Sequence, residues 1–192
     1  GTDVLFSFEL LDAWRVKDIV FYVLLGLATG IASVYFSKMY FLITRFFSRF
    51  SNAYIKIGIA AIAIGFMLYL FPPLYGEGYG LINNLLNGNT EVALSGIQYQ
   101  IDFNNIWMVI VILLIIAVFK AIAMTTTFAA GGVGGIFIPT LFMGSALGNA
   151  VAKAINQFGF EVSEANFTLI GMTGLMAGVL HAPLTAIFLI AE

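Results

Sequence analysis

Charged residues divide this chain into long uncharged segments whose lengths suit a lipid bilayer. Residues 19–37 carry no charge, and as an α-helix they would be roughly 28 Å long at ~1.5 Å per residue, close to the thickness of a hydrocarbon core. A second apolar segment, residues 57–71, stops at Pro72, because proline cannot continue a helix. A third, residues 106–126, starts beside Trp107, a residue type enriched at membrane interfaces. This pattern predicts membrane-spanning helices.

The remaining segments are shorter, or are interrupted by glycine and proline. The amphipathic residues 38–50 are expected to prolong the first helix toward the membrane surface, and the polar segment 74–105 has room for one short helix at 81–86. Three further helices are expected at residues 139–158, 166–180 and 184–192. Short, broken apolar segments are typical of transporters, whose substrate sites lie near the membrane midplane.

The clearest break is the sequence GGVGGIFIP at residues 131–139. It holds four glycines within five residues, and each glycine costs about 1 kcal/mol relative to alanine inside a helix. A helix should therefore end here and another begin near Pro139, since proline is favoured in a first helical turn. Irregular backbone at membrane depth is tolerated only when it is buried in protein or lines a polar cavity. The free N–H groups of the new helix would face that cavity, and they predict an anion pathway.

The composition is typical of a multi-pass integral membrane protein. Hydrophobic residues make up 61% of the sequence and charged residues only 9%, whereas soluble domains carry about 25% charged residues. A net charge of −2 argues against a nucleic-acid partner, and without cysteine the chain can form no disulfide, thiolate nucleophile or cysteine-based metal site. The middles of the apolar segments hold no acid and a single histidine, so acid–base catalysis has almost no candidates. We therefore expect no enzyme, no catalytic residue and no metal site.

The placement of charge predicts the orientation in the membrane. The loop 45–56 holds three basic residues and no acid, so the preference of basic loops for the cytoplasm places it inside. The loop 72–105 holds Glu77, Glu91 and Asp102 without any lysine or arginine, and we expect it outside. The first residues show no basic segment followed by a cleavage site, and they read as an internal start rather than a signal peptide.

Three ionisable residues allow a functional or a structural interpretation. Lys120 could assist an anion, but a lysine near a helix end more often extends to the interface, and we expect this snorkelling. His181, the only histidine, could relay protons, although its place before Ala182 and Pro183 favours a role in ending a helix. Glu192 closes an apolar run and is expected to be structural.

Three segments together resemble one membrane-protein family. KAIAMTTTFAAGGVGGIFIPTLFMGSALG, residues 120–148, is similar to the region around the GxFxP signature of CLC chloride channels and proton/chloride antiporters. GMTGLMAGVLHAPLTAIFLIAE, residues 171–192, and PPLYGEGYGLI, residues 72–82, resemble two further family segments in the same order and spacing. The resemblance implies an all-α fold with broken and re-entrant helices. Residues 1–192 would form the C-terminal half of its inverted-repeat domain, truncated at both ends.

The resemblance also implies where chloride binds. The GxFxP match runs from Gly135 to Pro139, and the backbone N–H groups of Ile136 and Phe137 are expected to contact the central chloride. Gly134, Gly135 and Pro139 are expected to shape the loop around the ion. The family's serine ligand in a GSGIP motif, its tyrosine ligand and its gating glutamate in a GxEGP motif do not occur in these 192 residues.

Two amides and one helix end fall short of holding a dehydrated anion. Burying an isolated ion costs several kcal/mol, whereas a charge-assisted hydrogen bond returns about 1.5–3 kcal/mol and a helix dipole up to about 2 kcal/mol. The chain alone is therefore not expected to transport chloride. The resemblance implies that the rest of the CLC domain, a bilayer of the cell's inner or plasma membrane and a homodimeric partner complete the protein. The dimer contact would involve Ile187, Leu189 and Ile190.

Two alternatives stay open at this point. The protein could be a voltage-gated channel or a proton-coupled antiporter, because the residues that discriminate them in the family lie outside these 192 residues. It could also be a non-transporting structural membrane subunit, in which small residues such as Gly144, Gly148 and Gly171 let helices pack closely without any ligand.

Overall fold

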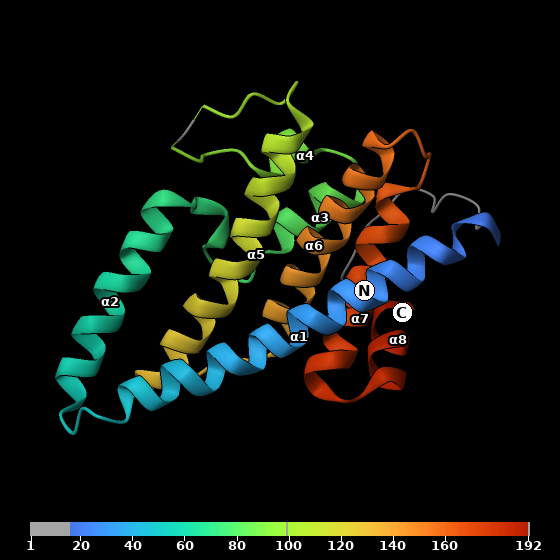
Figure 1. Ribbon diagram of the computed structural model, residues 1–192. Coiled ribbons are helices and arrows are strands. Elements are labelled where there is room, and N and C mark those ends of the chain that lie inside the picture. The colour runs from blue at the N-terminus through green and yellow to red at the C-terminus, as the bar shows by residue number, and fades with distance from the viewer. Residues whose placement is uncertain (1–15, 99, 192) are drawn as a thin grey trace, which may run out of the picture.

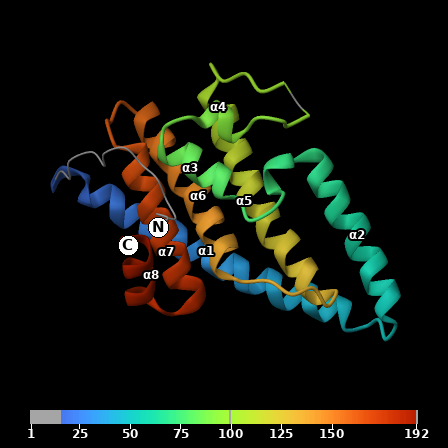
Figure 2. The same cartoon turned by 180° about the vertical axis from the view of Figure 1, so that it is seen from behind.

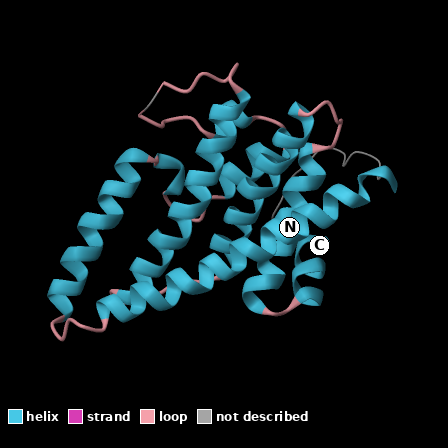
Figure 3. Cartoon of the chain, in the orientation of Figure 1, coloured by secondary structure: helices cyan, strands magenta, loops and turns pink. Residues whose placement is uncertain are grey.

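The computed structural model describes residues 16–98 and 100–191, and every regular element in this part of the chain is a helix (Figure 3). The expected all-α fold is confirmed. Glu192 and residues 1–15 lie outside the described part. The elements are η1, Val16–Asp18; α1, Ile19–Phe47; α2, Ala53–Leu70; η2, Pro72–Leu74; α3, Tyr79–Leu86; α4, Thr90–Ala93; α5, Ile106–Ala129; α6, Phe137–Gln157; α7, Glu164–Leu180; and α8, Pro183–Ala191.

The amphipathic segment after the first apolar run does prolong the first helix, so α1 is 29 residues long. Two other helices, α2 and α7, start earlier than the apolar pattern predicts, because polar residues cap them. The Asn52 side chain accepts a hydrogen bond from the Tyr54 amide at 2.9 Å, and α2 therefore begins four residues before the uncharged run. Ser163 accepts in the same way from the Asn166 amide and starts α7 two residues early.

Three stretches are long and apolar enough to cross a membrane, judged by length and composition: Val16–Phe47, Ala53–Leu70 and Ile106–Ala129. Their apolar residues face outward to a large extent, notably along α1 and α2, where most large hydrophobic side chains are exposed. Exposed apolar surface of this size requires a lipid or protein environment. The spanning segments predicted from the uncharged runs correspond to these three stretches.

The helices form a bundle in which α6 lies between α5 and α7 and packs against both (Figures 1 and 2). In both views α2 lies at one edge beside α5, and α7 and α8 lie toward the other (Figures 1 and 2). Helix α1 crosses the bundle obliquely and contacts α5 and α7. The short helices α3 and α4 pack against each other, and α3 also contacts α6 and α7 (Figure 1).

Helices α6 and α7 pack through backbone contact. A Cβ atom at Gly144 would overlap the carbonyl oxygen of Gly171, and one at Gly148 would overlap that of Phe167. Only glycine permits so close an approach, which is the small-residue packing expected between membrane helices. The core continues from this pair to α5, whose Leu113 is fully buried.

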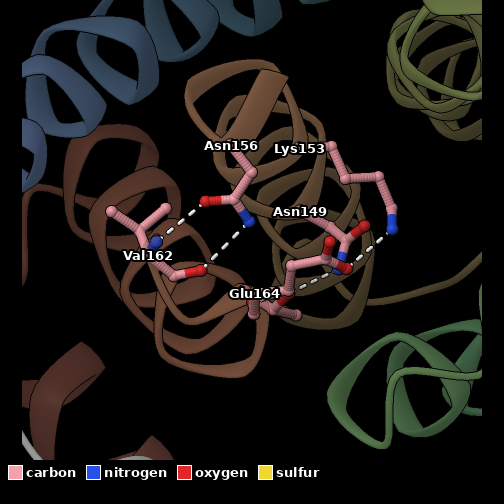
Figure 4. A network of polar contacts seen from close by, with 6 residues as sticks. Asn149, Lys153, Asn156, Val162 and Glu164 are labelled. Carbon is pink, nitrogen blue, oxygen red and sulfur yellow. Dashed lines mark hydrogen bonds and ion pairs between the residues drawn. The ribbon is translucent and has the colours of Figure 1, made fainter. Parts of the chain in front are cut away.

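Polar side chains stabilise the end of the α6–α7 pair at which a turn joins the two helices (Figure 4). The Lys153 ammonium lies 2.6 Å from a Glu164 carboxylate oxygen. The Asn156 side chain donates to the Val162 carbonyl at 3.1 Å and accepts from the Val162 amide at 2.8 Å. Deeper in the interface, Asn149 donates to the Thr168 hydroxyl at 3.3 Å. These bonds fix the turn that reverses the chain from α6 to α7.

Candidate anion site at the start of α6

The glycine-rich break ends α5 with a defined motif. The Gly131 amide donates to the Phe128 carbonyl at 3.0 Å, and the Gly132 amide donates to the Thr127 carbonyl at 2.9 Å. This pair of bonds is the Schellman arrangement, and it needs a left-handed residue just after the helix, which is Gly131 with φ +100°. The break is therefore an ordered helix end, as the four glycines predict.

Helix α6 begins at Phe137, two residues before the predicted start at Pro139. Ile136 is its N-cap residue, and Pro139 is the third residue of the helix. Proline fits there because the amides of the first turn have no partner within a helix, so the missing N–H breaks no bond. The prediction of a new helix near this proline was right, and its exact first residue was wrong.

The first turn of α6 leaves its amides free. Within the described part of the chain, the backbone N–H groups of Ile136 and Phe137 donate no hydrogen bond, and no side chain caps the helix. Phe137 is 47% exposed, so this turn is accessible. The first turn carries no acid, and residues 121–152 carry no charge at all. An uncapped helix start with no competing carboxylate is suited to an anion.

The sequence profile of the family described as voltage gated chloride channel matches residues 1–192. The chain belongs to this CLC family. It is 29% identical over 191 residues to the H(+)/Cl(−) exchange transporter ClcA of Salmonella paratyphi B, and equally so to that of Salmonella newport. It is 26% identical over 191 residues to a ClcB-like protein of Ralstonia nicotianae.

These alignments cover most of this chain and a minor part of each relative. They cover 96% of this chain, but only 36% of either ClcA protein and 39% of the ClcB-like protein. The chain therefore spans less than two fifths of the length of the curated relatives that it matches.

The loop residues expected to shape the site differ in how tightly they are held. A Cβ atom at Gly134 would come within 3.1 Å of the Phe128 ring, whereas one at Gly135 would meet nothing within 4 Å. The left-handed conformation belongs to Gly131, and Gly135 does not share it. A glycine directly after a helix end is a known signal for this conformation, so Gly131 could have been identified from sequence.

Lys120 corrects one expectation. It was expected to snorkel to the membrane interface, but its side chain is buried and only 5% of the residue is exposed. Its ammonium donates to the carbonyl oxygens of Leu74 at 3.1 Å and Gly76 at 2.9 Å. Snorkelling is unnecessary here because the chain itself supplies acceptors at that depth.

Beside Lys120 lies Phe142, a residue that sequence reasoning missed. The ammonium is 4.5 Å from the centroid of the Phe142 ring, and this phenylalanine of α6 is fully buried. A Cβ atom at Gly78 would overlap the same ring. No local pattern identifies Phe142, because its partners come from α5 and from the turn before α3.

His181 ends α7, as its position before Pro183 predicts. It is the C-cap residue and has φ +53°, the one positive φ outside glycine among the described residues. The described residues contain no group of three or more histidine, cysteine, aspartate or glutamate side chains that could hold a metal ion.

Proposed function

We propose that this chain takes part in transmembrane chloride transport, as part of a CLC-type voltage-gated channel or H+/Cl− antiporter. The observation that carries the proposal is the start of α6, where the GxFxP segment leaves the amides of Ile136 and Phe137 unpaired in an uncapped first turn. The named activities of the CLC relatives support the same ion.

In this proposal the chloride accepts hydrogen bonds from the Ile136 and Phe137 amides. Gly134 and Gly135 let the ion approach the backbone closely, and Pro139 stabilises the first turn without removing a needed donor. Side chains at positions 136 and 137 would not contact the ion by polar groups, because both are hydrocarbon. Selectivity for an anion then comes from backbone dipoles rather than from a positively charged side chain.

The chain is proposed to act only within a larger protein. Two charge-assisted bonds and one helix end return less free energy than the dehydration of an ion costs. Further donors must therefore converge on the same ion from outside these residues. The short share of each relative that the chain covers is consistent with this view. We propose that the remainder of a CLC domain and a second copy of the protein complete it.

We further propose a multi-pass position in the cell's inner or plasma membrane. The three long apolar helices support it, and the exposed apolar side chains of α1 and α2 would face lipid. The basic loop with Arg45, Arg49 and Lys56 would lie in the cytoplasm, and Glu77 and Glu91 outside.

The test is chloride efflux from liposomes that contain the whole protein. Loaded vesicles with the protein should release chloride when a counter-ion path is supplied, and vesicles without it should not. An antiporter would move protons against a pH gradient when driven by chloride, whereas a channel would not. Absence of any chloride flux from a folded, reconstituted protein would contradict the proposal.

A structural membrane subunit remains the second candidate. The backbone contact between Gly144 and Gly171 favours it, because close helix packing by itself explains several of the glycines. It does not explain the uncapped start of α6. Chloride-dependent thermal stabilisation of the purified protein would separate the two, since only a protein with an anion site gains stability from chloride.

A further inference from the structure

We propose that Lys120 is a positioning residue for the anion site. It binds the turn at residues 74–78 and the Phe142 ring at once, and thereby fixes where α6 begins. The inference rests on the proposed function, since what Lys120 positions is the turn that carries the amides of Ile136 and Phe137.

The Lys120 ammonium has its surroundings almost completely occupied. Two carbonyl oxygens accept from it, Leu74 at 3.1 Å and Gly76 at 2.9 Å, and the Phe142 ring centroid lies at 4.5 Å. An ammonium group has three N–H donors, so two carbonyls and one aromatic face account for them. Within the described residues Lys120 makes no ion pair. Its charge therefore interacts with backbone carbonyl groups and an aromatic ring rather than with a carboxylate.

The turn at residues 74–78 needs these donors. Its backbone is irregular, with φ +66° at Gly76 and +89° at Gly78, and the two prolines before it have no N–H to offer. Leu74 itself is only 4% exposed. The hydrogen bond from Lys120 to the Leu74 carbonyl is buried, and a buried carbonyl group without a partner is costly. Lys120 therefore ties this turn to α5.

The same turn rests on α6. The Gly78 backbone approaches the Phe142 ring so closely that a Cβ atom would overlap it. Phe142 is fully buried, so its ring cannot move away without disturbing the core. The Lys120 ammonium and the backbone of the turn therefore both contact the Phe142 ring. The glycine-rich turn is not part of the proposed chloride site. In this arrangement its role is to pack against Phe142 and support α6.

The Phe142 ring belongs to the first buried stretch of α6 after the helix start. Residues 136–139 are at least partly exposed and lack a side-chain cap, whereas Thr140, Leu141 and Phe142 are buried. The position of the free amides therefore depends on the anchor that follows them. Hydrogen bonds weaken steeply when their geometry is lost, so a shift of this anchor would weaken chloride binding.

The experiment measures chloride affinity by titration calorimetry on the whole protein. Lys120→Met should weaken binding by roughly 30-fold, the scale of a lost, desolvated cation–π contact. Phe142→Leu should weaken it similarly, and the double variant should be no weaker than Phe142→Leu alone. Lys120→Arg, which keeps the charge and the donors, should recover most of the affinity. Thermal unfolding is followed for each variant.

Lys153→Met is the matched control. Lys153 is nearly as buried, but it pairs with Glu164 at the far end of α6. Its loss should lower the unfolding midpoint without changing chloride affinity. A merely structural lysine at position 120 would behave in the same way, so equal behaviour of the two variants would overturn the proposal.

Other results also decide the matter. If the losses from Lys120→Met and Phe142→Leu add, Lys120 acts on the ion by its charge and not through the ring, and the proposal fails. If Lys120→Met does not fold, Phe142→Leu alone suffices, because unchanged affinity in that variant contradicts the mechanism. An unaltered protein that binds no chloride would instead contradict the proposed function itself, and this inference with it.

Discussion

Gly144 and Gly171 face each other so closely that a Cβ atom on either would overlap the carbonyl oxygen of the other. The backbones of α6 and α7 are therefore in contact at this level. Since α6 carries the candidate anion site at its start, this contact sets the orientation of the helix that presents the site.

Gly171→Ala should destabilise the protein by about 1–3 kcal/mol, because the added methyl group forces two backbones apart. Thermal unfolding in detergent is the measurement. Gly65→Ala on α2 is the control, since a Cβ atom there would meet nothing within 4 Å and alanine is the better helix former. Equal midpoints for the two variants would argue against the close approach.

Phe137→Pro should weaken chloride binding by roughly 10- to 150-fold, the loss expected for one charge-assisted hydrogen bond of about 1.5–3 kcal/mol. Phe137 is the first residue of α6, a position where proline is favoured, so the helix itself should persist. Proline also disfavours the helical conformation of the residue before it, which would disturb the Ile136 amide as well.

The control for this change is Ile136→Val, which trims a side chain and keeps the amide. Its chloride affinity should stay close to that of the unaltered protein. A folded Phe137→Pro protein with unchanged affinity would mean that the start of α6 is not the anion site.

Ser51→Cys and Asn89→Cys, each introduced into the whole protein without other cysteines, should be labelled from opposite sides of the membrane. Both positions are exposed, and they lie in the basic and the acidic loop at the two ends of α2. An impermeant thiol reagent added to intact cells should reach only position 89. Labelling of both cysteines from one side would contradict the proposed orientation.

His181→Gly should raise stability by about 1 kcal/mol, because a residue with a Cβ atom is strained at φ +53° and glycine is not. Unfolding midpoints give the comparison, with Ala182→Gly as the control at a position without positive φ. Proton-coupled transport, measured on the same variant, tests the proton-relay alternative, which requires the imidazole. If His181→Gly retains proton-coupled transport, His181 is not a proton relay and its role is confined to ending α7.

The dimer contact expected from the resemblance can be refined on α8. Leu184, Ile187 and Phe188 are exposed, whereas Leu189 and Ile190 pack partly against the core of their own chain. Ile187→Trp in the whole protein should therefore weaken self-association by about 1–3 kcal/mol through overpacking. Cross-linking or sedimentation in detergent measures it, with Ile62→Trp on the exposed face of α2 as the control. An unchanged dimer would place the interface elsewhere.

Local sequence signals predicted most of the helices. Charge-free runs gave the three long apolar helices, Pro72 gave the end of α2, and the glycines after α5 gave the break. Helix starts were less well predicted where a polar cap lies outside the apolar run, as Asn52 does before α2. The four residues of α4 were missed, since one turn leaves almost no periodic signal.

The candidate site also combines features that the sequence predicts with features that it does not predict. A helix end followed by a new helix start follows from local sequence, because a glycine break and a nearby proline act on the backbone independently of distant residues. That the donors are the amides of Ile136 and Phe137 was implied by the resemblance to the CLC family. The surroundings of Lys120 do not follow from sequence. Its acceptors lie 44 and 46 residues away along the chain, and Phe142 comes from another helix.

Local sequence therefore predicts the apolar surroundings of this protein, most of its helices and the break that leaves the start of α6 uncapped. These properties depend on the transfer of side chains from water and on local backbone preferences, which act over a few residues. The burial of Lys120, a lysine expected at the membrane surface, depends instead on how distant segments pack in the folded chain. A buried charge is stable only where the fold brings hydrogen-bond acceptors to it from other segments. The sequence around Lys120 does not contain these acceptors, so it does not predict the burial.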